Sequence, residues 1–164
     1  MPIRVPIRYL PPHLSRKDKQ KQVAMLARSK KQYKLNKYYT RKPVPSFHSK
    51  TSSHINNAKR IYGVDRITPN RALSRATGCS ISTLKRIVKK GEGAYFSSGS
   101  RPNQTAQSWG YARLASALTA GKSAAVDFSI LEEGCNHRKK AFHLAKTAKR
   151  KYGYGQGKTR KVKI

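Results

Sequence analysis

Positive charge is the feature that most restricts how this chain of 164 residues can fold, because it is abundant and unevenly distributed. Lys and Arg number 37 against six Asp and Glu, which gives a net charge of +31 at pH 7. Residues 1–60 hold 16 basic residues and one acidic residue, whereas residues 101–135 hold three of each. Residues 136–164 hold 11 basic residues and no acidic one. The sequence therefore predicts a neutral central module between two cationic arms, whose self-repulsion calls for an acidic partner.

The neutral segment is also where apolar residues gather. Leu, Ala, Trp109, Tyr111 and Phe128 are concentrated there, so it is expected to supply the folded core. The arms hold few aliphatic residues, and their own burial cannot easily offset the entropy lost on ordering. We predict a mainly α fold, with a small helical core and extended basic N-terminal and C-terminal arms that are largely mobile in isolation. The expected parts are an extended basic arm with one or two helices over residues 1–66, a compact helical module over 67–151 and a basic Gly-rich tail over 152–164.

Caps, glycines and prolines divide the chain into short helices. Ser15 and Asp18 form a capping box that opens the first helix, and Val23, Leu26 and Tyr33 give it a narrow apolar stripe. The predicted helices cover residues 15–33, 55–62, 68–78, 80–91, 105–120, 123–133 and 136–151. Gly, Ser and Pro content predicts a loop over residues 91–102. A short strand over residues 125–128 stays open as an alternative.

One local pattern is typical of a helix-turn-helix. Residues 73–87, LSRATGCSISTLKRI, read as two short helices with Gly at the turn. In that interpretation Ser82, Thr83 and Arg86 would face a major groove of DNA. Lys85, Lys89 and Lys90 would lie near phosphates. A plain helical hairpin with an apolar core is the alternative, and short motifs of this kind often match by chance.

Sites for catalysis or metal binding are not indicated. The six acidic residues leave few candidates for a general acid or base, and the adjacent Glu132 and Glu133 would point apart on a helix. Cys79, Cys135, His137 and His143 lack the spacing of a zinc site. Two cysteines suit a reducing compartment, although a single disulfide between them stays open. We therefore expect no enzyme activity, cofactor, metal or small-molecule substrate.

A resemblance extends over most of the chain. Residues 90–105, KGEGAYFSSGSRPNQT, and residues 108–117, SWGYARLASA, resemble a poorly characterised family of basic virion proteins from large icosahedral DNA viruses, such as those of algae. Residues 37–42, 126–127 and 130–135 share the likeness. The resemblance implies a structural minor capsid protein, made in the host cytoplasm, that ties capsid components together on the inner face of the shell. Its partners would be the major capsid protein and other minor capsid proteins, with DNA or an anionic inner-membrane surface as further candidates.

Basic and aromatic residues of the two arms are the predicted contacts with such partners. The candidate interface residues are Arg4, Arg8, Tyr38, Tyr39, Arg41, Arg101, Lys158, Arg160, Lys161 and Lys163. The nine Tyr residues could stack on bases, anchor a protein interface or cover neighbouring aliphatic stems, and the sequence does not separate these roles. An alternative function is a viral DNA-binding or condensing protein that uses the basic arms and the helical hairpin. A ribosomal-type protein would share the basic arms, but none of these motifs points to one.

Overall fold

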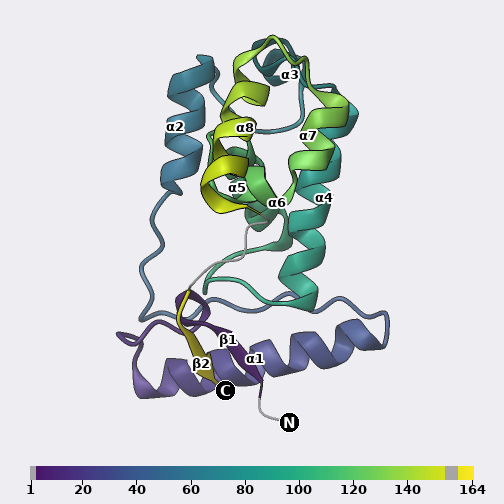
Figure 1. Cartoon of the computed structure of the whole chain (residues 1–164). Coiled ribbons are helices and arrows are strands. Elements are labelled where there is room, and N and C mark those ends of the chain that lie inside the picture. Colours follow the sequence, from purple (N-terminus) through teal and green to yellow (C-terminus); the bar gives the residue numbers. More distant parts are fainter. Residues whose placement is uncertain (1–2, 154–158) are drawn as a thin grey trace. The chain divides into compact units, whose positions relative to one another are not determined.

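The computed structural model describes residues 3–153 and 159–164, and these residues are mainly helical, as predicted (Figure 1). The elements are β1 (Arg4–Pro6), the 3-10 helix η1 (Ile7–Tyr9), α1 (Arg16–Lys34), α2 (Ser53–Tyr62), α3 (Arg71–Thr77), α4 (Ile81–Ser97), α5 (Ala106–Ala117), α6 (Lys122–Val126), α7 (Phe128–Gly134), α8 (Lys140–Tyr152) and β2 (Lys161–Lys163). The strand that stayed open as an alternative over residues 125–128 does not form, because α6 and α7 occupy this segment.

Contacts divide the chain into two compact units, and not at the predicted boundaries of residues 66 and 151. Unit 1 consists of Met1–Lys50, Glu92–Trp109 and Lys158–Ile164. Unit 2 consists of Thr51–Gly91 and Gly110–Gly157. Most of the N-terminal arm and the end of the C-terminal tail therefore belong to the same unit, together with a segment from the middle of the chain.

Unit 2 contains the main apolar core. Its buried residues come from α2 to α8 and include Leu84, Leu114, Leu118 and Leu131, all fully buried. A disulfide joins Cys79, just after α3, to Cys135, just after α7. Backbone hydrogen bonds flank it, from Ser80 N to Gly134 O at 3.0 Å and from Asn136 N to Gly78 O at 2.8 Å. The sequence alone did not decide whether this disulfide forms. In the structure it joins the turn of the helical hairpin to the end of α7.

Helix α4 is longer than predicted, and the loop expected from residue 91 begins only after Ser97. At Gly91 the absence of a side chain lets α4 approach α5 closely, since an added Cβ would lie 2.6 Å from the Gly110 Cα. One turn further on, Tyr95 is fully buried. Gly91 therefore permits close helix packing and does not end the helix.

Three other helix boundaries differ from the predictions. The helix predicted from residue 68 begins at Arg71, because its cap is Asn70, whose side chain accepts from Leu73 N and donates to Thr68 Oγ1. The helix predicted over residues 123–133 is broken at Asp127 into α6 and α7. Helix α8 starts at Lys140, since Asn136 accepts from Arg138 N in a turn that precedes the helix.

Helix α1 begins as predicted but buries a different face. Ser15 Oγ accepts from Asp18 N at 3.1 Å, which confirms the cap. Of the predicted stripe, Leu26 is buried, but Val23 is half-buried and Tyr33 is exposed. The buried residues of α1 are Asp18, Gln22, Met25, Leu26 and Ser29. They recur at helical spacing, but three of the five are polar, so a search for apolar periodicity finds only part of this face.

The two ends of the chain lie side by side in unit 1 (Figure 1). Strands β1 and β2 pair antiparallel, with Val5 opposite Val162. Val5 is buried with Tyr9 and Leu26, and Val162 packs against this cluster. A second small cluster contains Leu14, Met25 and Val44. Unit 1 thus has only small apolar clusters, and the prediction of two separate arms extending from one core differs from this arrangement.

Candidate polyanion-binding surface

The outer side of α1 is basic along its whole length. Its exposed Lys and Arg residues are Arg16, Lys17, Lys21, Arg28, Lys31 and Lys34. The only acidic residue of the helix, Asp18, is buried and accepts a hydrogen bond from Ser46 N at 2.7 Å. Hydrogen bonds from Ser46, with smaller contributions from Ser15 and the charge of Lys21, lower the pKa of Asp18. The helix therefore exposes its cations, while its carboxylate is buried and accepts hydrogen bonds inside the unit.

The structure brings most of the predicted interface arginines and lysines into unit 1. These are Arg4, Arg8, Arg101, Arg160, Lys161 and Lys163. Arg8 lies over the ring of Tyr9, 5.1 Å from its centroid, and Tyr9 meets Trp109 edge to face. Burial and the nearby charge of Arg8 lower the pKa of Arg101. Arg4 and Lys163 are distant in sequence and meet because β1 and β2 pair. Lys158 lies outside the described residues.

Arg41 was predicted to contact a partner, and its position contradicts this. Its side chain is only 6% exposed, with the guanidinium carbon 3.8 Å from the centroid of the Tyr95 ring. Its two terminal nitrogens donate to Ser29 Oγ at 2.8 Å and Ser100 Oγ at 2.9 Å. Burial lowers the pKa of Arg41, and the aromatic face and two hydroxyls take the place of a carboxylate. Arg41 is therefore an internal tie of unit 1.

The segment that carries the viral resemblance makes many of these internal ties. Tyr95 Oη accepts from Arg41 N at 2.9 Å. The side chain of Asn103 accepts from Val44 N at 2.7 Å and donates to Phe47 O at 2.9 Å. Residues 95–103 therefore hold the loop of residues 41–47 in place through polar contacts, which suits a unit with small apolar clusters.

Of the aromatic candidates, Tyr38 is exposed and Tyr39 is covered. Tyr38 is 69% exposed and lies beside Phe96, with ring centroids 5.0 Å apart. Tyr39 is half-buried beneath Arg28, whose guanidinium carbon lies 4.3 Å from the ring centroid. Tyr38 is thus free to meet a partner, whereas Tyr39 already covers its neighbours.

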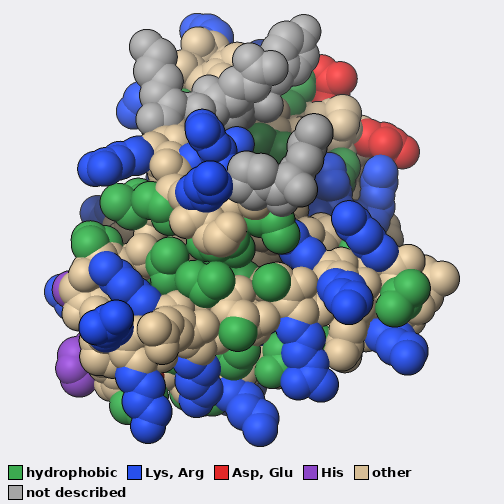
Figure 2. Space-filling view, turned by 90° about the horizontal axis from the view of Figure 1, so that it is seen from below, with side chains coloured by type: hydrophobic (Ala, Val, Ile, Leu, Met, Phe, Trp, Pro, Cys, Tyr) green, Lys and Arg blue, Asp and Glu red, His purple; other side chains and the backbone are tan. Residues whose placement is uncertain are grey.

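Charge in unit 1 is almost uncompensated. Its three segments contain 19 Lys and Arg against two acidic residues, Asp18 and Glu92. Among the residues that the structure describes, the ion pairs are Arg86–Glu133, Lys90–Asp127 and Arg113–Asp127, all within unit 2. Figure 2, seen from the side of α1, β1 and β2, shows Lys and Arg side chains spread across this face. We define the unit 1 surface as the exposed Lys and Arg residues of α1, β1, β2 and the adjoining Arg8, Arg101 and Arg160.

The helical hairpin places five of its six candidate DNA contacts on the exposed side of α4. These are Ser82, Lys85, Arg86, Lys89 and Lys90. Thr83 was wrongly included: it is only 3% exposed and its hydroxyl shares a hydrogen bond with Ser80 Oγ at 2.8 Å. The end of α7 covers it, since a Cβ at Gly134 would collide with the Thr83 side chain. Arg86 pairs with Glu133 at 3.4 Å.

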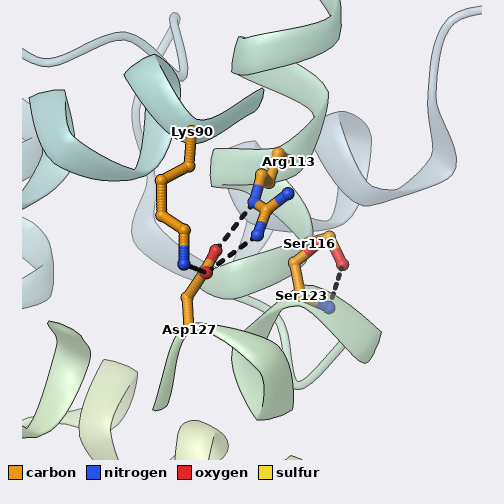
Figure 3. Close-up of polar contacts among 5 residues, drawn as sticks. All are labelled: Lys90, Arg113, Ser116, Ser123 and Asp127. Atoms are coloured by element: carbon orange, nitrogen blue, oxygen red, sulfur yellow. Dashed lines mark hydrogen bonds and ion pairs between the residues drawn. The ribbon is translucent and has the colours of Figure 1, made fainter. Parts of the chain in front are cut away.

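A buried polar cluster in unit 2 has the residue types of a catalytic site but not its accessibility (Figure 3). Asp127 is fully buried and accepts from Arg113 Nε and Nη2, both at 2.9 Å, and from Lys90 Nζ at 3.0 Å. Next to it, Ser123 N donates to Ser116 Oγ at 3.3 Å. Both carboxylate oxygens of Asp127 accept hydrogen bonds from the protein, so this cluster joins the α6–α7 junction to α4 and α5.

The described residues include no group of three or more His, Cys, Asp or Glu side chains placed to hold a metal ion. Cys79 and Cys135 are engaged in the disulfide, and His137 stacks on Phe142 with ring centroids 3.9 Å apart. No helix in the described ranges is long and apolar enough to cross a membrane.

A known protein family covers most of the chain. A family model matches residues 6–133, which run from β1 through α7. The chain belongs to a family of unknown function (DUF5824). The matched range contains Arg41, the ties of residues 95–103 and the helical hairpin, and ends before Cys135, α8 and β2. No curated protein and no solved structure matches the sequence.

Proposed function

We propose that this DUF5824 protein is a non-enzymatic structural protein, a minor capsid protein that ties capsid components together on the inner face of a large DNA virus shell. In this proposal the unit 1 surface binds acidic faces of the major capsid protein and of other minor capsid proteins. The observation that carries it is the gathering of both cationic chain ends on one unit that has almost no negative charge of its own.

Electrostatics supports a macromolecular partner. Exposed like charges on one small unit repel one another, and the repulsion is relieved when an acidic surface covers them. Because single exposed ion pairs contribute little, a surface of many weak contacts suits a large and extended partner. The small apolar clusters of unit 1 point the same way, since partner contacts would stabilise a unit that buries little itself.

The resemblance to basic virion proteins supplies the identity of the partner. Its most specific segment, residues 90–105, overlaps the internal ties of unit 1, so the shared residues are those that build the proposed binding unit. This favours a shared structural role over a shared reaction.

Fractionation of virus particles tests the proposal. Purified particles are opened gently at low salt, their genome is digested with nuclease, and the chain is followed by immunoblot. The chain is expected to remain with the emptied shells and to leave them only as salt is raised, because screening weakens exposed charge pairs. Release by nuclease alone, at unchanged salt, would contradict a capsid role.

A second candidate function, binding of viral DNA, is favoured by the exposed stripe of α4. Ser82, Lys85 and Lys89 lie one turn apart on the outer face of a 17-residue helix. If these lysines contact phosphates, the double variant K85Q/K89Q should reduce the slope of log affinity against log salt on duplex DNA by about 1.8, at about 0.9 per phosphate. An unchanged slope would leave the hairpin a structural feature.

A further inference from the structure

The β1–β2 ribbon has one apolar face and one cationic face. Residues directly opposite each other in an antiparallel pair project to the same side. Val5 and Val162 face the interior of unit 1, together with Ile3 and Ile164 two residues away along each strand. The other face carries Arg4 opposite Lys163, and Lys161 opposite Pro6. Arg4, Lys161 and Lys163 are all exposed.

Like charges therefore meet across the ribbon. Arg4 and Lys163 stand in direct register, where the Cβ atoms of opposite residues lie only about 5 Å apart and like charges destabilise the pair. Within the described residues of unit 1 no carboxylate forms an ion pair with any of the three cations. Further cations lie close to the ribbon. The pKa of Lys30 is lowered by burial and by the nearby charges of Lys34 and Lys161.

The pairing itself is weakly supported. Each strand has three residues, and a two-stranded ribbon of this size is marginal without additional packing. The outermost inter-strand bonds run from Ile7 N to Arg160 O at 2.9 Å and from Ile164 N to Ile3 O at 2.8 Å. Apolar packing on one face favours closure, and cation repulsion on the other opposes it. An anion on the cationic face would remove the opposing contribution.

We propose that the cationic face of the ribbon is a binding site for a multivalent phosphate ligand, and that the ligand closes β2 onto β1. The inference goes beyond the proposed function, since it assigns to one part of the unit 1 surface a ligand other than an acidic protein face. The Cβ atoms of Arg4, Lys161 and Lys163 lie within about 8 Å of one another along and across the strands. A chain of linked phosphates carries a charge every few ångströms, as in a nucleic-acid strand, and thus matches this spacing better than carboxylates on separate side chains.

Closure and binding are reciprocal. A ligand that binds only the closed ribbon shifts the ribbon toward closure by the same factor by which closure raises affinity. Neutralising Lys163 has two opposite consequences: it relieves repulsion in the free chain and removes a ligand contact. A purely structural role for Lys163 predicts neither.

Amide hydrogen exchange of the full chain tests this inference. Exchange at Ile7 and Ile164 is measured alone and with tripolyphosphate, a single-stranded oligonucleotide or polyglutamate. Tripolyphosphate is expected to slow both amides by about fivefold or more, and to leave the Leu118 amide, which bonds to Leu114 O in unit 2, unchanged. An added effect of the oligonucleotide identifies a nucleic-acid backbone as one source of the phosphates, and its absence points to free polyphosphate.

Two variants sharpen the test. K163Q is expected to slow exchange at Ile164 without ligand and to reduce the response to tripolyphosphate. K140Q, which changes an exposed lysine at the start of α8 in unit 2, serves as the matched control and should behave like the wild type.

Unchanged exchange at both ribbon amides with tripolyphosphate would overturn the site, and an equal effect of polyglutamate would overturn the phosphate assignment. A chain that remains with emptied shells but shows no phosphate effect refutes this inference alone. A phosphate effect in a chain released by nuclease refutes the capsid role alone.

Discussion

Replacement of Asp127 by Ala should destabilise unit 2 severely, because Asp127 anchors a buried charge cluster. The carboxylate is fully buried and accepts three hydrogen bonds of 2.9 to 3.0 Å from Arg113 and Lys90. Removing one partner of a buried ion pair leaves the other charge uncompensated and costs about 3–5 kcal/mol. Since domains of this size are stable by about 5–15 kcal/mol, D127A would lose a large share of the total.

The Lys90 side chain provides the matched comparison. It is 48% exposed and contacts the same carboxylate, so its charge is well solvated. K90A should therefore cost less than about 1 kcal/mol. D127N keeps the shape of the side chain but loses its charge, and it should fall between the two, at about 1–3 kcal/mol.

Urea unfolding at neutral pH checks these values. Far-UV circular dichroism follows the helices of both units, while fluorescence of Trp109, the single Trp, reports unit 1. The midpoint should fall in the order K90A, D127N, D127A with the slope unchanged. If D127A does not fold, the order of K90A and D127N still decides. A cost for K90A equal to that of either Asp127 variant would refute the argument from burial.

Three further predictions concern packing, the disulfide and pH. G91A should lower the free energy of unfolding by about 1–3 kcal/mol, because the added Cβ meets the backbone of α5. G93A adds a Cβ that meets nothing within 4 Å, so it should raise the free energy of unfolding by up to about 1 kcal/mol. Equal effects of the two variants in thermal unfolding would contradict the close helix approach. Reduction of the Cys79–Cys135 disulfide, which spans 56 residues, should cost about 4 kcal/mol in the chain-entropy treatment, and identical urea midpoints with and without reductant would count against it. Because the folded-state pKa of Asp18 is lowered, the stabilising contribution of its carboxylate is complete above the unfolded-state pKa near 4 and is lost as pH falls through the folded-state pKa. Below pH 4 the urea midpoint followed by Trp109 fluorescence should therefore drop less in D18N than in the wild type. Superimposable curves of midpoint against pH would argue otherwise.

Local signals made some of the helix ends predictable. The cap at Ser15 and the stops at Gly63 and Gly78 depend on a few neighbouring residues, and all three are confirmed. Gly91 was misread because a glycine that permits close helix packing has the same local signature as one that ends a helix.

Polar contacts between residues far apart in the chain could not be predicted from the sequence. The buried face of α1 includes Gln22, which donates to Tyr9 O, and Ser29, which accepts from Arg41. Neither contact has a periodic apolar signature. Arg41 looked like a surface cation because its partners, Tyr95 and Ser100, come from a distant segment.

The candidate surface was predictable in its residue types but not in its assembly. Charge counts identified both cationic arms, and all nine of the predicted contacts that the structure describes lie in unit 1. Only the pairing of Arg4 with Lys163 shows that the two ends form one surface, and such non-local strand pairing carries no local sequence signal in three-residue strands.

Rebinding to emptied shells is the measurement that tests the central claim most directly. Nuclease-treated shells are stripped of the chain with salt and then incubated with wild-type protein, with K17Q/K31Q/K34Q on α1, or with K85Q/K89Q on α4; all five lysines are exposed. If the unit 1 surface binds the shell, the α1 variant should bind about tenfold more weakly or worse, at about 0.5 kcal/mol or more per charge, and the α4 variant should bind like the wild type. Undiminished binding of the α1 variant, or a larger loss in the α4 variant, would contradict the account.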